Sequence, residues 1–237
     1  MFKGPYRGRL LLPGLIVLVA VASPPVVSGP RWALQAPRQP GLQYQYALGS
    51  VTISIPPPKG FEEVLSRFQD MRDRMPDTDR LENLAVHLPA DVVKTFVPGQ
   101  DLSFYTKVSI SKAIKTSDVS ETFFAGMKKE MASGKVFDAE ALRKYLAEVK
   151  QKPGITVNQT VQLGVVDQTP ETITVLGLMT VTAGDRKVDV LFSTSGVYLR
   201  RRFFIVYSFR MLETTKDVAA LIAFTKDWVG SIVTANP

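Results

Sequence analysis

The chain of 237 residues contains no cysteine and a single histidine, His87. Without cysteine it forms no disulfide, no thiolate metal site, no cysteine nucleophile and no lipid-modified N-terminal cysteine. One histidine excludes a metal site built from several histidines. The sequence also lacks the glycine-rich phosphate loops of the P-loop and dinucleotide-binding types. We therefore expect neither a metal nor any other cofactor.

The charge balance is basic but moderate. Apolar residues make up 45% of the chain and charged residues 22%, as in ordinary globular proteins. The formal net charge is +7, and Lys3, Arg7 and Arg9 supply three of these charges within the first nine residues. The remaining excess is too small to favour nucleic acid as a partner.

The first 22 residues have the pattern of an export signal. The basic segment 1–9 is followed by an apolar stretch over 10–22, which ends in the small-x-small sequence Ala20-Val21-Ala22. This pattern predicts a secretory signal peptide over 1–22, cleaved near Ala22, and an exported protein, periplasmic or secreted. The alternative is a membrane-tethered protein that retains the signal as an anchor. Its 13 apolar residues fall short of the ~20 that span a bilayer.

A proline-rich segment separates the signal from the rest of the chain. Residues 23–42 contain five prolines and no acidic residue, a composition typical of an extended tether. No second linker of this kind follows. We therefore predict one folded domain over 43–235.

Segments of alternating apolar and polar residues predict strands. They lie at 50–55, 83–88, 102–112, 155–165, 172–182, 186–195 and 203–209. The last is apolar on both faces, which is typical of a central strand. Turn-forming residues at 167–170 and 183–186, and a less clear connection after Ser195-Gly196, predict a C-terminal antiparallel meander of four strands. His87 is expected at the surface or edge of the sheet.

Apolar residues spaced three and four apart predict helices. These stripes lie within 61–75, 118–131, 138–149 and 215–232. Each stripe is expected to pack against the sheet. The fold class is therefore α+β: a mainly antiparallel sheet flanked by helices in an α/β/α sandwich-like arrangement.

Three segments carry a resemblance at the level of topology. They are VTISIPPPKGF at 51–61, DVSETFFAGMKKEM at 118–131, and FFIVYSF at 203–209, which is followed by ALIAFTKDWVGSIV at 220–233. With them the chain resembles exported bacterial proteins of unknown function and is loosely similar to the Mog1/PsbP-like α/β/α sandwich. The resemblance implies a non-catalytic accessory or binding role and no functional residue.

The best candidate for an interaction site is the basic strip Arg200, Arg201 and Arg202. It could contact an anionic partner: lipid headgroups, a cell-envelope polymer or an acidic protein. The alternative is a charged connection that keeps the very apolar strand at 203–209 soluble.

A catalytic alternative rests on carboxylates near the turns of the meander. Asp167, Glu171, Asp185 and Asp189 lie at or close to these turns, where paired carboxylates could act in a hydrolase-like reaction. No serine elbow or other catalytic motif accompanies them. We therefore favour an exported, non-enzymatic envelope or periplasmic accessory or binding protein, whose partner is a protein or a cell-envelope component.

Overall fold

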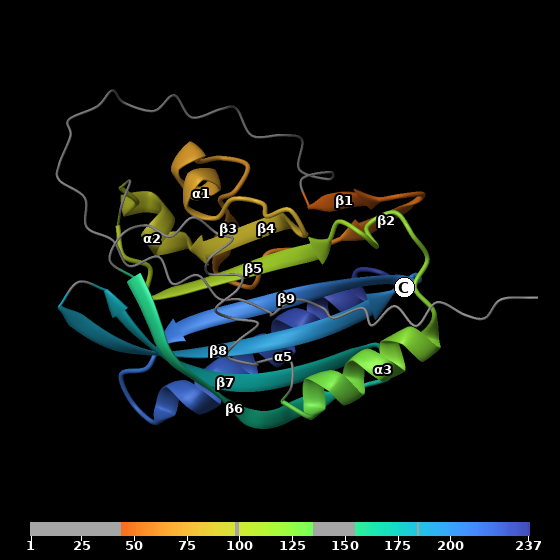
Figure 1. Ribbon diagram of the computed structural model, residues 1–237. Helices are drawn as coiled ribbons and strands as arrows, with labels where there is room; N and C mark the ends of the chain where they lie inside the picture. The colour runs from red at the N-terminus through yellow and green to blue at the C-terminus, as the bar shows by residue number, and fades with distance from the viewer. Residues whose placement is uncertain (1–43, 98–99, 135–154, 184) are drawn as a thin grey trace, which may run out of the picture.

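The computed structural model describes residues 44–97, 100–134, 155–183 and 185–237 (Figure 1). The predicted signal peptide, the tether and the helix expected within 138–149 lie outside these described residues. Within them, no helix combines the length and the apolar character needed to cross a bilayer.

A seven-stranded antiparallel sheet forms the centre of the fold (Figure 1). Its spatial order is β3 (Phe61–Glu63), β4 (Leu81–Pro89), β5 (Phe104–Ser111), β9 (Arg202–Met211), β8 (Arg186–Leu199), β7 (Thr172–Ala183) and β6 (Ile155–Gln168). The predicted C-terminal meander is confirmed, because β6 to β9 are neighbours in sequence order and pair antiparallel. The apolar strand β9 is the middle strand of the seven, as its sequence predicted.

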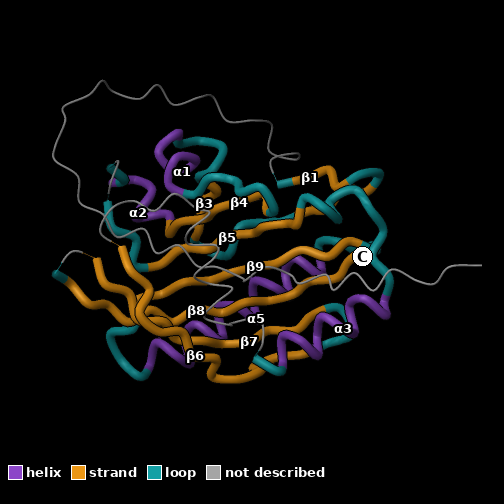
Figure 2. Tube along the Cα trace, in the orientation of Figure 1, coloured by secondary structure: helices purple, strands orange, loops and turns teal. Residues whose placement is uncertain are grey.

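Helices lie on both faces of this sheet (Figure 2). The long helix α5 (Lys216–Thr234) covers one face, and α3 (Glu121–Ala132) packs over β7 and β8 on the other. Two short helices, α1 (Gln69–Arg74) and α2 (Ala90–Thr95), lie beside the β3–β4 end. The hairpin of β1 (Gln45–Leu48) and β2 (Val51–Ser54) forms a separate two-stranded sheet. The predicted α+β class is therefore confirmed.

Strand β9 contributes to both halves of the core because its side chains alternate between the faces. Ile205 and Tyr207 lie in the cluster that includes Met127 and Met131 of α3. Phe204 and Val206 lie in the cluster beneath α5, with Trp228. Each cluster is closed by an amphipathic helix, which explains why a strand with no polar face stays out of water.

The helix predicted over 61–75 is wrong in its first half. Phe61–Glu63 forms the edge strand β3 paired with β4, and helix begins only at Gln69. The edge of β4 offers unpaired main-chain groups, and Val64 N also donates to Val86 O at 2.8 Å. The local spacing of apolar residues carries no information about a partner strand that lies elsewhere in the sequence. The strand expected at 50–55 exists, but it belongs to the β1–β2 hairpin and not to the main sheet.

His87 is fully buried beneath α5, and not at a surface or edge as predicted. Its Nδ1 lies 3.0 Å from Oγ1 of Thr106, and its ring meets the Trp228 ring edge-on at 5.3 Å between centroids. A register shift between Asn83 and Ala85 alters the alternation of β4 just before His87. Burial lowers the pKa of His87 to about 3.

This burial makes the fold sensitive to acid. The unfolded chain protonates His87 near pH 6.5, whereas the folded chain holds it neutral down to about pH 3. The contribution of His87 is therefore fully present above pH 6.5 and is lost as the pH falls towards 3, at up to about 1.4 kcal/mol per pH unit. We expect His87→Gln, which cannot protonate, to flatten the fall of the unfolding free energy between pH 6 and 4 in urea titrations. A slope identical to that of the wild type would contradict the assignment.

Candidate functional site

The β8–β9 connection is a two-residue turn formed by Arg200 and Arg201. Leu199 and Arg202 are the last paired residues of the two strands. Arg200 has φ 48° and Arg201 has φ 63°. Two successive positive φ angles are the mark of a type I′ hairpin turn, where Asn-Gly is the preferred sequence. Two arginines in this conformation carry backbone strain that a purely structural turn would avoid.

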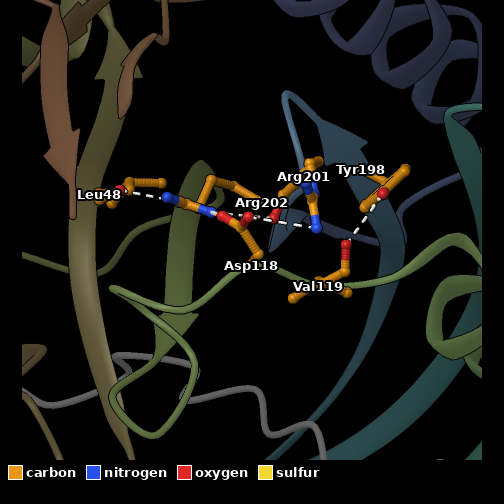
Figure 3. Close-up of polar contacts among 6 residues, drawn as sticks. All are labelled: Leu48, Asp118, Val119, Tyr198, Arg201 and Arg202. Atoms are coloured by element: carbon orange, nitrogen blue, oxygen red, sulfur yellow. Dashed lines mark hydrogen bonds and ion pairs between the residues drawn. The ribbon is translucent and has the colours of Figure 1, made fainter. Parts of the chain in front are cut away.

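The third member of the basic strip, Arg202, points into the protein. It is 1% exposed. Its Nε donates to the carbonyl oxygen of Leu48 at 2.8 Å, and its Nη1 donates to Oδ1 of Asp118 (Figure 3). Arg202 therefore joins strand β9, the β1–β2 hairpin and the segment that leads into α3. Of the three arginines predicted to contact an anionic partner, only Arg200 and Arg201 remain candidates. The guanidinium of Arg202 is buried and bonded, so it does not reach a partner.

Asp118 pairs with two of the three arginines. Its Oδ1 accepts from Arg202, and its Oδ2 lies 3.3 Å from Nη2 of Arg201. The hydrogen bond from Arg202 lowers the pKa of Asp118, and the charges of Arg201 and Arg202 add to this effect. Asp118 therefore stays ionised and anchors the turn through its contacts with Arg201 and Arg202.

The segment from Asp118 to α3 is fixed on the turn by main-chain bonds as well. Val119 N donates to the carbonyl oxygen of Arg201 at 2.9 Å, and the Tyr198 hydroxyl donates to the carbonyl oxygen of Val119 at 2.9 Å (Figure 3). Ser120 then caps α3 by accepting from Phe123 N at 3.1 Å. The turn is thus a rigid platform and not a loose loop.

Positive charge is in excess at this platform. The guanidinium of Arg200 donates to the main-chain oxygens of Thr52 at 3.3 Å and Pro237 at 3.1 Å. The side chain of Arg201 is 67% exposed. Within the described ranges, Asp118 is the one side-chain carboxylate that these three arginines contact. One negatively charged side chain therefore faces three positively charged side chains.

The carboxylates at the meander turns do not form one site. Asp167 and Glu171 lie at the β6–β7 turn, whereas Asp185 lies at the opposite end of β7. Strand β7 has 12 residues, so its two ends are separated by about 40 Å. The expectation that these acids could approach one another is wrong for Asp185 relative to Asp167 and Glu171, because successive turns of the meander lie at opposite ends of the sheet. Asp189, which pairs with Thr180, lies towards the same end as Asp185.

The other three acids, Asp167, Glu171 and Asp189, each have a hydrogen-bond or ion-pair partner that accounts for their position without a catalytic role. Asp167 pairs with Lys226 at 3.2 Å, and Asp189 accepts from the Thr180 hydroxyl at 2.6 Å. Glu171 accepts from the Thr169 hydroxyl at 3.2 Å, a contact within the turn. In the part of the chain that the structure describes, no group of three or more His, Asp or Glu side chains is placed to hold a metal ion.

Sequence reasoning identified the arginines but missed Asp118 as their partner. It treated Asp118 as the start of a helix. The two residues of this ion pair, the half-exposed Asp118 and the buried Arg202, are 84 positions apart. No local pattern signals such a pairing, which exists because β9 and the entry to α3 meet in space.

No protein-family model matches the sequence, and neither does any curated protein. Among solved structures, the Ran-binding protein Mog1p of Saccharomyces cerevisiae matches with a TM-score of 0.34 and 12% identity, over 86% of this chain and 95% of that one. A variant of protein Mog1 matches with a TM-score of 0.33 and 14% identity, over 81% of this chain and 94% of that one. The loose Mog1-like similarity expected from the sequence is confirmed. It concerns the fold and assigns no activity.

The ion pair of Arg202 predicts a specific loss of stability. Asp118→Asn keeps an oxygen acceptor but removes the charge that the buried guanidinium faces. We expect it to lower the free energy of unfolding, measured by urea denaturation at pH 7, because the guanidinium of Arg202 then lacks its charged partner. The exposed Asp79→Asn serves as the control and should change little. Equal effects of the two substitutions would contradict the role of Asp118.

The strained turn predicts an effect of the opposite sign. The double substitution Arg200→Asn with Arg201→Gly installs the residues that favour positive φ. We expect it to raise the free energy of unfolding by about 1 kcal/mol, because relief of strain outweighs the loss of exposed arginine contacts. The same pair of positions changed to valine should destabilise the protein. A stabilised valine variant would show that the turn is not strained.

Proposed function

We propose that this chain is an exported, non-enzymatic accessory protein of the cell envelope that contacts an anionic surface through Arg200 and Arg201. The observation that carries the proposal is the arginine turn. It presents two solvent-facing guanidinium groups on a strained backbone, although smaller residues would suit that backbone better. Strain retained at a surface turn is a common feature of binding sites.

The chemistry of the turn favours phosphate or carboxylate groups. A guanidinium offers a planar pair of donors that matches both anions. The platform beneath it is held by Arg202, Asp118 and Val119, so little backbone freedom is lost when a partner binds. The excess of positive charge also attracts an anionic surface before contact.

Export and the absence of catalysis are parts of the same proposal. The basic start, apolar stretch and small-residue exit of residues 1–22 support cleavage near Ala22. The hydrolase-like alternative loses support because its carboxylates are separated along the sheet.

We expect intact-mass measurement of the protein from an exporting host to give a chain that begins at Ser23. A mass that retains residues 1–22, in a protein that stays with membranes after a high-salt wash, would favour the tethered alternative.

Vesicle binding tests the anionic contact. We expect the protein to sediment with phosphatidylglycerol vesicles and not with phosphatidylcholine vesicles, and binding to weaken as salt rises. The Arg200→Asn, Arg201→Gly variant folds without strain, and we expect it to bind at least tenfold more weakly.

The matched control removes two exposed positive charges at the other end of the sheet, in Lys94→Gln with Lys216→Gln. It should bind as the wild type does. If the wild type ignores both kinds of vesicle, or if both variants lose affinity equally, the turn is not the contact surface.

A further inference from the structure

Strand β6 forms one edge of the main sheet (Figure 1). It pairs with β7 on its inner side, and among the residues that the structure describes no strand pairs with its outer side. With 14 residues, β6 is as long as any described strand. Alternate residues of an edge strand direct their N–H and C=O groups away from the sheet. The outer side of β6 therefore offers main-chain donors and acceptors to another strand.

The opposite edge of the sheet is protected against such pairing, whereas this edge is not. Strand β3, at the opposite edge, has only three residues, and two of them are Glu62 and Glu63. Short length and charged side chains are common means of keeping an edge strand from pairing with another chain. Strand β6 contains no lysine, arginine or proline, and its one charged residue is Asp167, next to its last residue.

Exposed apolar side chains are concentrated on β6. Four large apolar side chains are exposed in the described ranges, and three of them lie within five residues of this strand. Val161 is 39% exposed, Leu163 is 51% exposed and Val165 is 42% exposed. The fourth, Val97, follows α2 and is 58% exposed. Single exposed apolar residues are normal, but a group of them on one edge strand marks a contact surface.

The apolar surface continues from β6 onto β7. Val161 pairs with Leu178 of β7, and Leu178 is only partly buried, against the cluster that includes Leu221 of α5. Helix α5 packs over β8 and β9, nearer the centre of the sheet. The outer part of this face is therefore incompletely covered by the described helices.

Bulges in β6 limit where a partner strand can pair. Register shifts interrupt the pairing of β6 with β7 at three places, and the run between the first two is Gln159–Gln162. A bulge bends the strand and increases its twist, so a straight partner fits best where bulges are absent. The run Gln159–Gln162 includes the exposed Val161. We therefore expect a partner strand to centre on this run.

We propose that β6 pairs with β6 of a second copy of this chain, antiparallel about a two-fold axis, so that the two main sheets join edge to edge. A two-fold interface needs a surface that is complementary to itself. A charged residue opposite its own copy would repel it. All side chains of Gln159–Gln162 are neutral, and their amide and hydroxyl groups can both donate and accept hydrogen bonds. This run meets the requirement, and it is independent of the arginine turn.

The one charge on the strand does not oppose this pairing. Asp167 forms an ion pair with Lys226 of α5 at 3.2 Å. In an antiparallel joint centred on Val161, the two copies of Asp167 lie at opposite ends, about 40 Å apart. Like charges of the two strands therefore do not meet, while Val161 of each copy is removed from water.

Sedimentation velocity of the purified protein over a range of concentrations tests the proposal. We expect a reversible equilibrium between monomer and dimer. Val161→Lys places two ammonium groups at the joint and should raise the dissociation constant of the dimer at least about tenfold. The matched control is Val97→Lys, the same substitution at an exposed valine outside β6. It should dimerise as the wild type does.

A mixture of oppositely charged variants separates loss of contact from loss of folding. Val161→Glu alone should also weaken the dimer, because two carboxylates then meet. An equimolar mixture of Val161→Glu and Val161→Lys should form dimers again, because the substituted side chains attract one another across the joint. Unfolded variants would not restore the dimer.

The absence of cysteine from the chain allows the register of the joint to be mapped. Two-fold pairing within one sheet brings residues of the same face opposite one another. We therefore expect Val161→Cys to form a disulfide-linked dimer under mild oxidation, either alone or when mixed with Gln159→Cys. Val97→Cys serves as the control and should remain unlinked on a non-reducing gel.

Two results would overturn the proposal. One is a wild-type protein that stays monomeric at every concentration. Hydrogen exchange of the β6 amides would then distinguish an edge that another part of the same chain covers from an edge that is open to a different protein. The other is a dimer that Val161→Lys weakens no more than Val97→Lys does, because the interface would then lie elsewhere.

Discussion

The buried guanidinium of Arg202 is the contact on which the arrangement of the elements depends. It lies at the first residue of the central strand and binds two segments that are remote in sequence, the β1–β2 hairpin through Leu48 and the entry to α3 through Asp118. A buried charge tolerates no loss of its partners, because an unpaired ion costs far more than an unpaired neutral group. The hairpin, the α3 entry and the β8–β9 turn are therefore fixed relative to one another by one side chain.

The same contact explains how the neighbouring arginines are presented. Because Arg202 and Asp118 hold the base of the turn, Arg200 and Arg201 project from a backbone that does not need to be ordered on binding. The three consecutive arginines thus have two different roles. One is structural and faces inward, and two face solvent on a strained turn, which is the surface proposed to contact an anionic partner.

The buried polar side chains on the two faces of the sheet differ in their hydrogen-bond partners. Beneath α5, Thr225 reaches across to the serines of β8 and β9 and completes their hydrogen bonds. On the other face, Lys107 and Thr194 lie in an otherwise apolar cluster. The Oγ1 atom of Thr194 is buried there without a hydrogen-bond partner among the described residues, so neighbouring rows of one sheet differ in whether a helix completes the hydrogen bonds of their hydroxyls.

Much of the fold was predictable because its signals are local. Alternation of apolar residues gave the long strands β6 to β9, the two apolar faces of β9 predicted its central position, and the three- and four-residue spacing gave α3 and α5. Prediction failed where a distant partner decides the outcome. Phe61–Glu63 is a strand because β4 has a free edge, and His87 is buried because Trp228 lies over it.

The sequence by itself determined the absence of cysteine chemistry, the export-like first 22 residues, the antiparallel meander and the three adjacent arginines. Only the tertiary structure decided that Arg202 turns inward to Asp118, that Asp185 stands far from Asp167, and that Lys107 and Thr194 share one face. The physical reason is that periodicity sets which way a side chain points along its own element. Strand order, register and the packing of helices over the sheet decide what that side chain meets.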